Sequence, residues 1–222
     1  MKIVKGLTLS YFIKRAYENY GFVSAFIYGF QGVGKTTYGL KVLHGIYNDW
    51  DMVLENTYFY IDNLLPKLKE SYKSGERIKA ILLDDAGVWL TKYYWYRHFS
   101  VWFSKFFNLI RTVCAGLLFT SVEVTDIVKF VRDKMVYRVA IKPENRLWRK
   151  AIGYKVVLLP SLDRIVVRYF VDRFTLKLPS DVRKQYEEMR KEALEKLMSE
   201  IERKKQPPKP PAIKLDALIR EL

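Results

Sequence analysis

The chain has 222 residues, half of them hydrophobic, and its 39 lysine and arginine residues against 24 aspartate and glutamate residues give a net charge of +15. Its single cysteine, Cys114, excludes an internal disulfide framework, and no run of about 18 apolar residues predicts a membrane-spanning helix. We therefore expect a soluble, cytoplasmic protein with a substantial core and a polyanionic partner, and the low content of glutamine and cysteine favours a thermophilic source.

Strands and helices alternate along the first part of the chain. The predicted strands are continuously apolar, which is typical of a parallel sheet buried on both faces. We therefore predict an α/β fold, a three-layer sandwich around a mainly parallel five-stranded sheet. In chain order the sequence predicts a helix over 8–20, a strand over 22–28, a helix over 37–47, a strand over 58–61, a helix over 62–72, a strand over 79–83, a helix over 98–111, a strand over 115–121, a helix over 124–134 and a strand over 136–141.

The pattern changes after residue 141. Two β-rich runs predict a hairpin that turns at 160–163, and a charged helix follows from Ser180 to about Lys204. The apolar stripe of this helix is expected at Leu194, Leu197, Met198 and Ile201. The proline-rich run 206–211 predicts a stiff linker, and 213–222 a tail helix that could dock on a protein partner. These changes divide the chain into an N-terminal helix (1–21), a core (22–141), a basic β-hairpin extension (142–179), a charged helix (180–205) and a linker with tail (206–222).

The run from Gly29 to Thr36, GFQGVGKT, fits the pattern G-x-x-x-x-G-K-[ST] and stands between a predicted strand and a predicted helix. Glycines let backbone N–H groups approach phosphate oxygens closely, and the following helix points its free N–H groups at the anion. The run resembles the phosphate-binding loop of P-loop NTPases, which implies ATP and Mg²⁺ as ligands, with Lys35 on the β- and γ-phosphates and the Thr36 hydroxyl on the metal. The residues that we expect to contact the nucleotide are Gly29, Phe30, Gln31, Gly32, Val33, Gly34, Lys35, Thr36 and Thr37.

Two carboxylates, Asp84 and Asp85, directly follow the apolar strand over 79–83. In the P-loop pattern we expect Asp84 to bind Mg²⁺ through water, and Asp85 to polarise the attacking water as the catalytic base. Hydrolytic members of this division usually have Glu at the second position, so the shorter Asp predicts a repositioned water or slow turnover. Thr120, near the end of the strand over 115–121, is the expected sensor for that water, with Ser121 as second choice. A helix cap at the carboxylates and a turn cap at Thr120 are the structural alternatives.

Part of the chain also resembles the replication-initiator and helicase-loader branch of AAA+ ATPases, in the segments 104–111, 116–121 and 126–138. The stretch 28–89 resembles P-loop ATPases encoded by archaeal viruses and plasmids. The first resemblance implies a homo-oligomer in which Arg132 or Arg138 reaches the γ-phosphate bound to a neighbouring subunit, and a solvated position is the alternative for both. A basic hairpin stands where AAA+ proteins have a small helical lid, which favours a RecA-like or divergent member of the additional-strand division.

Two further segments are candidates for contact with DNA. In 89–99 aromatic residues alternate with cations, a composition that suits stacked bases and phosphates but also a core or an interface. The cations of the hairpin could contact phosphates or protect an exposed sheet edge. They are Arg146, Arg149, Lys150, Lys155, Arg164, Arg168 and Arg173.

The leading interpretation is an oligomeric Mg²⁺-dependent ATPase of an archaeal virus or plasmid that acts on DNA in replication initiation, helicase loading, translocation or packaging. The first alternative is a nucleotide-gated interaction protein with little turnover, whose tail (213–222) recruits a partner. The second is a nucleoside or nucleotide kinase, although the chain lacks the arginine-rich lid expected of that class.

Overall fold

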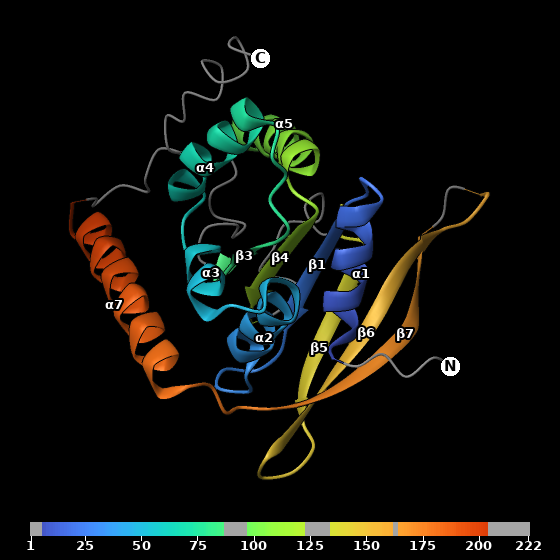
Figure 1. Ribbon diagram of the computed structural model, residues 1–222, viewed down its shortest axis with the longest axis vertical. Coiled ribbons are helices and arrows are strands. Elements are labelled where there is room, and N and C mark those ends of the chain that lie inside the picture. Colours follow the sequence, from blue (N-terminus) through green and yellow to red (C-terminus); the bar gives the residue numbers. More distant parts are fainter. Residues whose placement is uncertain (1–5, 87–96, 123–133, 162–163, 204–222) are drawn as a thin grey trace.

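A seven-stranded mixed sheet organises the chain (Figure 1). The computed structural model describes residues 6–86, 97–122, 134–161 and 164–203, and describes no side chains over 97–104 and 200–203. Its helices are α1 (Thr8–Glu18), α2 (Lys35–Tyr47), α3 (Trp50–Glu55), α4 (Ile61–Ser74), α5 (Arg97–Val113) and α7 (Ser180–Arg203). Its strands are β1 (Val23–Tyr28), β2 (Thr57–Tyr58), β3 (Ile81–Leu83), β4 (Gly116–Ser121), β5 (Tyr137–Pro143), β6 (Trp148–Leu158) and β7 (Arg164–Thr175).

The strands follow the spatial order β2-β3-β4-β1-β5-β6-β7. Neighbours from β2 to β5 pair in parallel, whereas β6 pairs antiparallel with β5 and with β7. The prediction of a five-stranded sheet is therefore wrong, because the hairpin strands β6 and β7 extend the same sheet to seven strands. Without β6, the backbone N–H and C=O groups along the outer edge of β5 would lack partners, and the hairpin satisfies them by continuing the same sheet.

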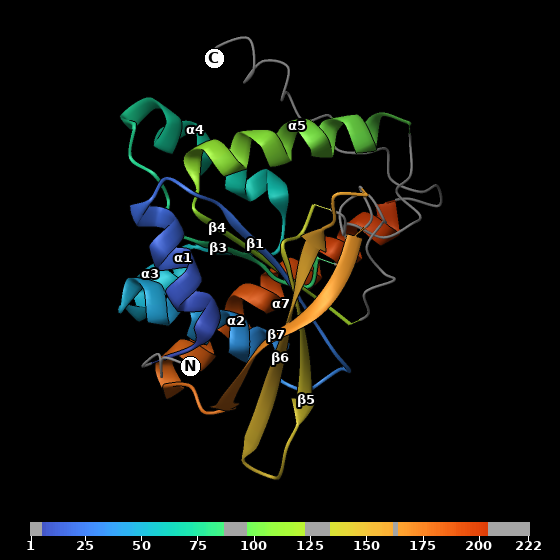
Figure 2. The same ribbon diagram turned by 90° about the vertical axis from the view of Figure 1, so that its right-hand side faces the viewer.

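Helices cover both faces of the sheet, and the side chains of β1 show why. Ala25 and Ile27 point to the cluster formed with α1, α2 and α3, while Phe26 between them points to the cluster formed with α4 and α5. This alternation follows from the two-residue period of a strand. Figure 2 shows α4 and α5 on one side of the sheet and α1 to α3 on the other, so the predicted three layers are present.

Local segments differ from the expectation in two places. The sequence did not predict α3, which begins after Asp49, whose carboxylate accepts hydrogen bonds from the N–H groups of Asp51 and Met52 and so caps the helix. β2 comprises only Thr57 and Tyr58, because α4 already begins at Ile61. The helix predicted over 124–134 lies almost entirely outside the described residues.

Candidate functional site

The predicted phosphate loop joins the end of β1 to the start of α2. Gly34 precedes α2 with a φ of 103°, in the left-handed region, and gives the helix no side-chain cap. A Cβ at this position would lie 2.3 Å from Cδ2 of Leu176, and a Cβ at Gly29 would lie 2.7 Å from the carbonyl oxygen of Ile141. Glycine is therefore favoured at both ends of the loop, and no side chain of Gly34 caps the first N–H groups of α2.

Lys35 lies against the loop that it follows. Its amine donates hydrogen bonds to the carbonyl oxygens of Gly29 at 3.0 Å and Phe30 at 3.1 Å, and the residue is only 8% exposed. A buried ammonium beside uncapped helix N–H groups provides the positive potential that a phosphate chain needs. Thr36, the next residue in α2, points its hydroxyl at the end of β3.

The carboxylate of Asp84 is the centre of this cluster, and it is fully buried. The Thr36 hydroxyl donates to both of its oxygens at 3.1 Å, and the hydroxyls of Thr120 and Tyr186 donate to one oxygen each. Burial and the neighbouring charge of Asp85 raise the pKa of Asp84 above its ordinary value, and the three hydroxyl donors partly oppose that shift.

Strand register explains why Asp84 and Thr120 meet. Leu83 of β3 pairs with Phe119 of β4. The next residues in the chain, Asp84 and Thr120, therefore lie beside each other at the same edge of the sheet. Thr120 in turn pairs with Ile27 of β1, two residues before the loop begins. The structure thus brings together Thr36, Asp84 and Thr120, and Lys35 stands beside Thr36 at the start of α2. The roles of these residues in binding and catalysis stay predictions.

Asp85 adopts a different geometry from Asp84. Its φ is 50°, and its N–H donates a hydrogen bond of 2.9 Å to the Thr120 hydroxyl. Its side chain is 37% exposed, and its carboxylate lies 3.6 Å from the guanidinium of Arg190 in α7. One of the two carboxylates is therefore buried in the hydroxyl cluster, while the other faces α7.

The donor set fits Mg²⁺. Thr36 and Asp84 supply adjacent hard oxygen atoms, and Mg²⁺ in nucleotide sites is usually held by one or two protein oxygens together with phosphates and water. No group of three or more histidine, cysteine, aspartate or glutamate residues that could hold a metal occurs among the residues that the structure describes. A metal here would therefore depend on the phosphates as well as on Thr36 and Asp84.

Sequence reasoning missed the contribution of α7. The stripe predicted for this helix is wrong at Leu194 and Met198, which are 48% and 55% exposed, whereas Leu197 is half-buried and the side chain of Ile201 lies outside the described ones. Val182 and Tyr186 are the buried residues among the described side chains of α7. Val182 and Tyr186 stand four residues apart, which places them on one face of a helix. That spacing could have predicted that Val182 and Tyr186 share a buried face, but it could not have identified Asp84 as the hydrogen-bond partner of Tyr186.

The arginines expected to act between subunits take different positions. Arg132 lies outside the described residues. Arg138 is half-buried within β5, where it pairs with Phe26 of β1 and Tyr154 of β6. Its role across a subunit interface stays a prediction, and within the described chain Arg190 is the arginine that contacts a carboxylate of the cluster.

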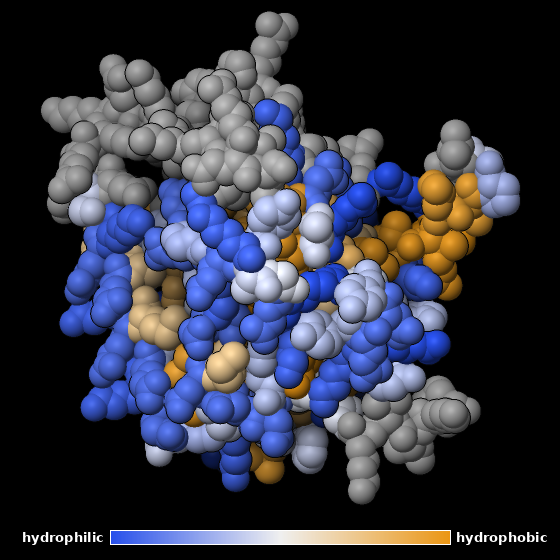
Figure 3. All heavy atoms as spheres, turned by 45° about the horizontal axis from the view of Figure 1, so that its top comes forward, coloured by the Kyte–Doolittle hydropathy of each residue, from blue (hydrophilic) through white to orange (hydrophobic). Residues whose placement is uncertain are grey.

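The predicted DNA-binding segments are only partly described. Residues 89–96 lie outside the described ranges. In the hairpin, Lys150 and Arg173 both contact Glu144, at 2.9 and 2.8 Å. Hydrophobic side chains gather on the protruding end of the hairpin (Figure 3), and the exposed apolar residues there are Leu158, Ile165, Val166 and Val167. The hairpin surface is thus basic and apolar rather than uniformly basic.

No helix in the described ranges is both long enough and apolar enough to cross a bilayer. No protein-family model matches the chain. The solved N-terminal domain of zonular occludens toxin from Neisseria meningitidis aligns with 68% of this chain and 95% of that domain, at 12% identity and a TM-score of 0.40.

Two viral proteins are similar in sequence. Uncharacterized protein ORF286 of Acidianus two-tailed virus is 27% identical over 188 residues, which cover 81% of this chain and 63% of that protein. Uncharacterized protein B-251 of Sulfolobus spindle-shape virus 1 is 33% identical over 206 residues, which cover 86% of this chain and 82% of that protein. The predicted relation to proteins of archaeal viruses is thus confirmed, and the chain belongs to the same family as B-251.

Proposed function

We propose that this protein binds ATP with Mg²⁺ at the loop from Gly29 to Thr36 and hydrolyses it slowly. The observation that carries the proposal is the hydrogen bonding of Thr36 and Thr120 to the buried carboxylate of Asp84. Three segments far apart in the sequence supply these groups at one edge of the sheet. A chance glycine-rich turn would not be expected to have a buried carboxylate and two hydroxyls beside its following helix.

Each residue has a distinct role in this proposal. The loop N–H groups and Lys35 bind the phosphate oxygens, and Thr36 and Asp84 hold the metal. The bound Mg²⁺ supplies positive charge that neutralises the phosphates. The Thr120 hydroxyl donates a hydrogen bond to the carboxylate of Asp84 and accepts one from the N–H of Asp85. Thr120 thereby fixes the positions of these two groups relative to each other.

The order of the strands supports a place in the additional-strand division of P-loop NTPases. β4, with Thr120, stands between β1, which leads into the loop, and β3, which leads to Asp84. This insertion puts Thr120 beside both halves of the proposed site. The more specific relation to the AAA+ branch is part of the same proposal and predicts an oligomer.

Slow turnover follows from Asp85. Its side chain is one methylene shorter than Glu, its backbone has a left-handed φ of 50°, and its carboxylate lies beside Arg190. A general base must come within hydrogen-bond reach of the water that it activates, and such a base contributes about 10²–10⁴-fold to a rate. We therefore expect the protein to bind Mg²⁺–ATP well and to hydrolyse it slowly.

The test is nucleotide binding and phosphate release by the wild type, Lys35→Ala and the exposed control Lys73→Ala. We expect the affinity for Mg²⁺–ATP to fall at least about tenfold in Lys35→Ala, which equals about 1.4 kcal/mol, and to stay unchanged in Lys73→Ala. Equal affinity of all three proteins, or no binding by the wild type, would contradict the proposal.

DNA is the polyanion on which we propose the ATPase acts. The net charge of +15 and the hairpin cations Arg164 and Arg168 support this choice. DNA binding by Arg164→Gln/Arg168→Gln is expected to weaken and to have a smaller salt dependence than that of the wild type. Turnover that does not respond to DNA, together with no binding at moderate salt, would remove DNA from the proposal.

A further inference from the structure

Helix α7 brings two side chains to the carboxylates at the end of β3. The Tyr186 hydroxyl donates to Asp84, and the Arg190 guanidinium lies 3.6 Å from Asp85. The two residues are one helical turn apart, so they reach the two carboxylates from the same face of the helix. Figure 1 shows α7 crossing the side of the molecule where α3 and the end of β3 lie.

The rest of α7 is loosely attached. Among its described side chains, 180–199, only Val182 and Tyr186 are buried. A cavity of about 390 Å³ lies between the helix and the segment 57–60. Beyond Tyr186, the partly buried Met189 packs against the core and Arg190 lies beside Asp85. The Tyr60 hydroxyl also donates a 2.6 Å hydrogen bond to the carbonyl oxygen of Ala193, and the amine of Lys196 lies 4.3 Å from the centre of the Tyr60 ring. A helix with so few buried side chains opens more easily than the elements of the core.

The surroundings of the Asp84 carboxylate are filled by three hydroxyl donors, and the residue is fully buried. The single proton of the Thr36 hydroxyl is shared between the two carboxylate oxygens, and Thr120 and Tyr186 donate one proton each. Thr36 belongs to α2 and Thr120 to a central strand, so both are fixed by the core. A water bound to Mg²⁺ is also a hydrogen-bond donor, and it can reach this enclosed carboxylate only if one of these donors leaves.

We propose that Tyr186 competes with hydrated Mg²⁺ for Asp84, so that binding of a Mg²⁺–nucleotide releases α7 from the site. This inference rests on the proposed function. Tyr186 is a positioning residue in this scheme, because it acts on the nucleotide through Asp84 and need not touch it. Release of α7 also removes Arg190 from Asp85, which frees that carboxylate at the moment when a nucleotide is present.

Coupling of this kind is reciprocal. If metal–nucleotide binding shifts α7 to the released state, then weakening the attachment of α7 must tighten metal–nucleotide binding by the same factor. A residue that merely supported the fold would behave in the opposite way, since its loss would weaken the site. The sign of the change in affinity therefore separates the two roles.

Hydrogen exchange of the full chain measures the release directly. With a non-hydrolysable ATP analogue and Mg²⁺, we expect the amides of 182–196 to exchange at least about fivefold faster than without ligand. With the analogue in EDTA they should keep their protection, because hydrated Mg²⁺ is the competing donor. Unchanged exchange when Mg²⁺ and analogue are bound would overturn the inference and leave the nucleotide site in place.

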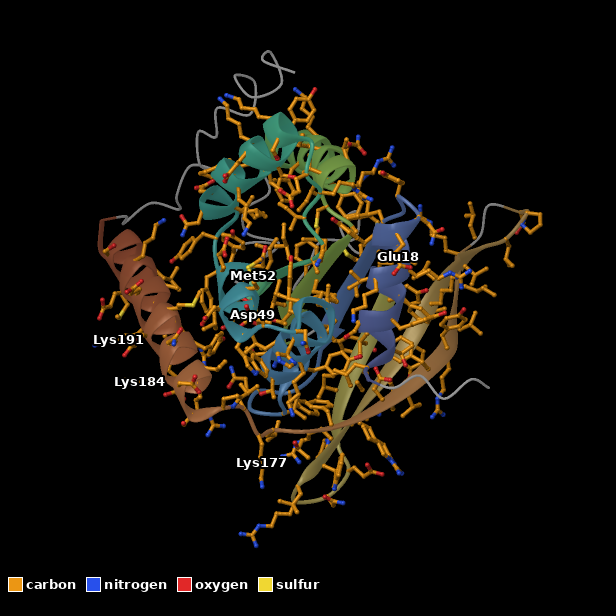
Figure 4. All side chains as sticks on the ribbon, in the orientation of Figure 1. Glu18, Asp49, Met52, Lys177, Lys184 and Lys191 are labelled. Atoms are coloured by element: carbon orange, nitrogen blue, oxygen red, sulfur yellow. The ribbon has the colours of Figure 1, made fainter. Side chains whose placement is uncertain are left out.

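The matched variants are Tyr186→Phe, which removes the hydroxyl and keeps the ring, and Lys184→Gln on the outer side of α7 (Figure 4). We expect Tyr186→Phe to bind the Mg²⁺–analogue at least about threefold more tightly and to show faster exchange of α7 without ligand. Lys184→Gln should match the wild type in both measurements. Equal or weaker binding by Tyr186→Phe would overturn the inference, and a wild type that binds no nucleotide would overturn it together with the proposed function.

Discussion

The hydroxyl of Tyr38 in α2 donates a 2.8 Å hydrogen bond to Asp172 in β7, and both groups are buried. Asp172 also accepts from the N–H and the hydroxyl of Thr8, at 2.9 and 2.6 Å, at the start of α1. One carboxylate thus ties the hairpin to the helix that follows the phosphate loop and to the N-terminal helix.

Replacement of Asp172 by Ala should therefore destabilise the whole domain. It leaves the Tyr38 hydroxyl and the Thr8 N–H without an acceptor, and each unsatisfied buried group costs about 1–3 kcal/mol. Urea unfolding should show a fall in the free energy of unfolding of that size or more. The double variant with Tyr38→Phe should lose less than the sum of the two single variants. Additive losses would show that the two groups do not interact.

The stability of the protein should depend on the protonation of Asp84. Because the pKa of this carboxyl is raised on folding, the folded state binds a proton more tightly than the unfolded state, whose aspartates titrate near about 3.9. The stabilising effect is present below that pH and is lost as pH rises through the folded pKa. The free energy of unfolding of Asp84→Asn should therefore rise relative to that of the wild type as the pH increases above about 4. Parallel pH profiles of the two proteins would contradict the burial argument.

Substitution of Asp85 by Asn should separate binding from turnover. Asn tolerates the left-handed backbone that φ of 50° requires, so the fold should be retained while the proposed base is lost. Phosphate release should fall, although by less than the about 10²–10⁴-fold that a well-placed general base contributes, and affinity for Mg²⁺–ATP should change less than about threefold. The exposed Glu70→Gln serves as the control. Turnover by Asp85→Asn at the wild-type rate would assign the base elsewhere.

Substitution of Gly34 by Ala should disrupt the loop more than substitution of Gly32. Both have positive φ, but a Cβ at Gly34 would clash with Leu176, whereas a Cβ at Gly32 meets nothing within 4 Å. Strain in the backbone costs about 1–3 kcal/mol at such positions, and the clash adds to it only at Gly34. Thermal unfolding and nucleotide affinity of the two variants give the comparison, and equal effects would mean that Leu176 moves aside.

Cys114 should be inert in the native state. The side chain is fully buried, and burial raises the pKa of its thiol to about 12, so at pH 8 very little thiolate is present to react. A thiol reagent should therefore label the native protein only at the rate of unfolding, and label it promptly in denaturant. Fast labelling in native buffer would reveal local opening around β4.

The sequence predicted best what is encoded locally. The loop from Gly29 to Thr36 requires only a strand, glycines and a helix start, all within a few residues, and Asp84 and Thr120 stand at or near the ends of apolar strands. The seven-stranded extent of the sheet could not be predicted in this way, because the pairing of β5 with β6 depends on which backbone groups would otherwise lack partners. The prediction of the buried face of α7 failed at Leu194 and Met198 for a similar reason. Apolar residues spaced three or four apart occur on more than one face of this helix, and only the position of Asp84 in the fold determines that the face with Tyr186 is buried.

The end of the hairpin strand β7 lies against the phosphate loop. Leu176 covers Gly34, and the amine of Lys41 in α2 donates a 2.7 Å hydrogen bond to the carbonyl oxygen of Thr175. The other end of the hairpin protrudes beyond the helices (Figure 1). Two long hydrogen-bonded strands join these ends, with one irregularity in their pairing at Gly153 and Tyr154. A partner bound at the protruding end would therefore be connected through continuous strands to the residues around the loop.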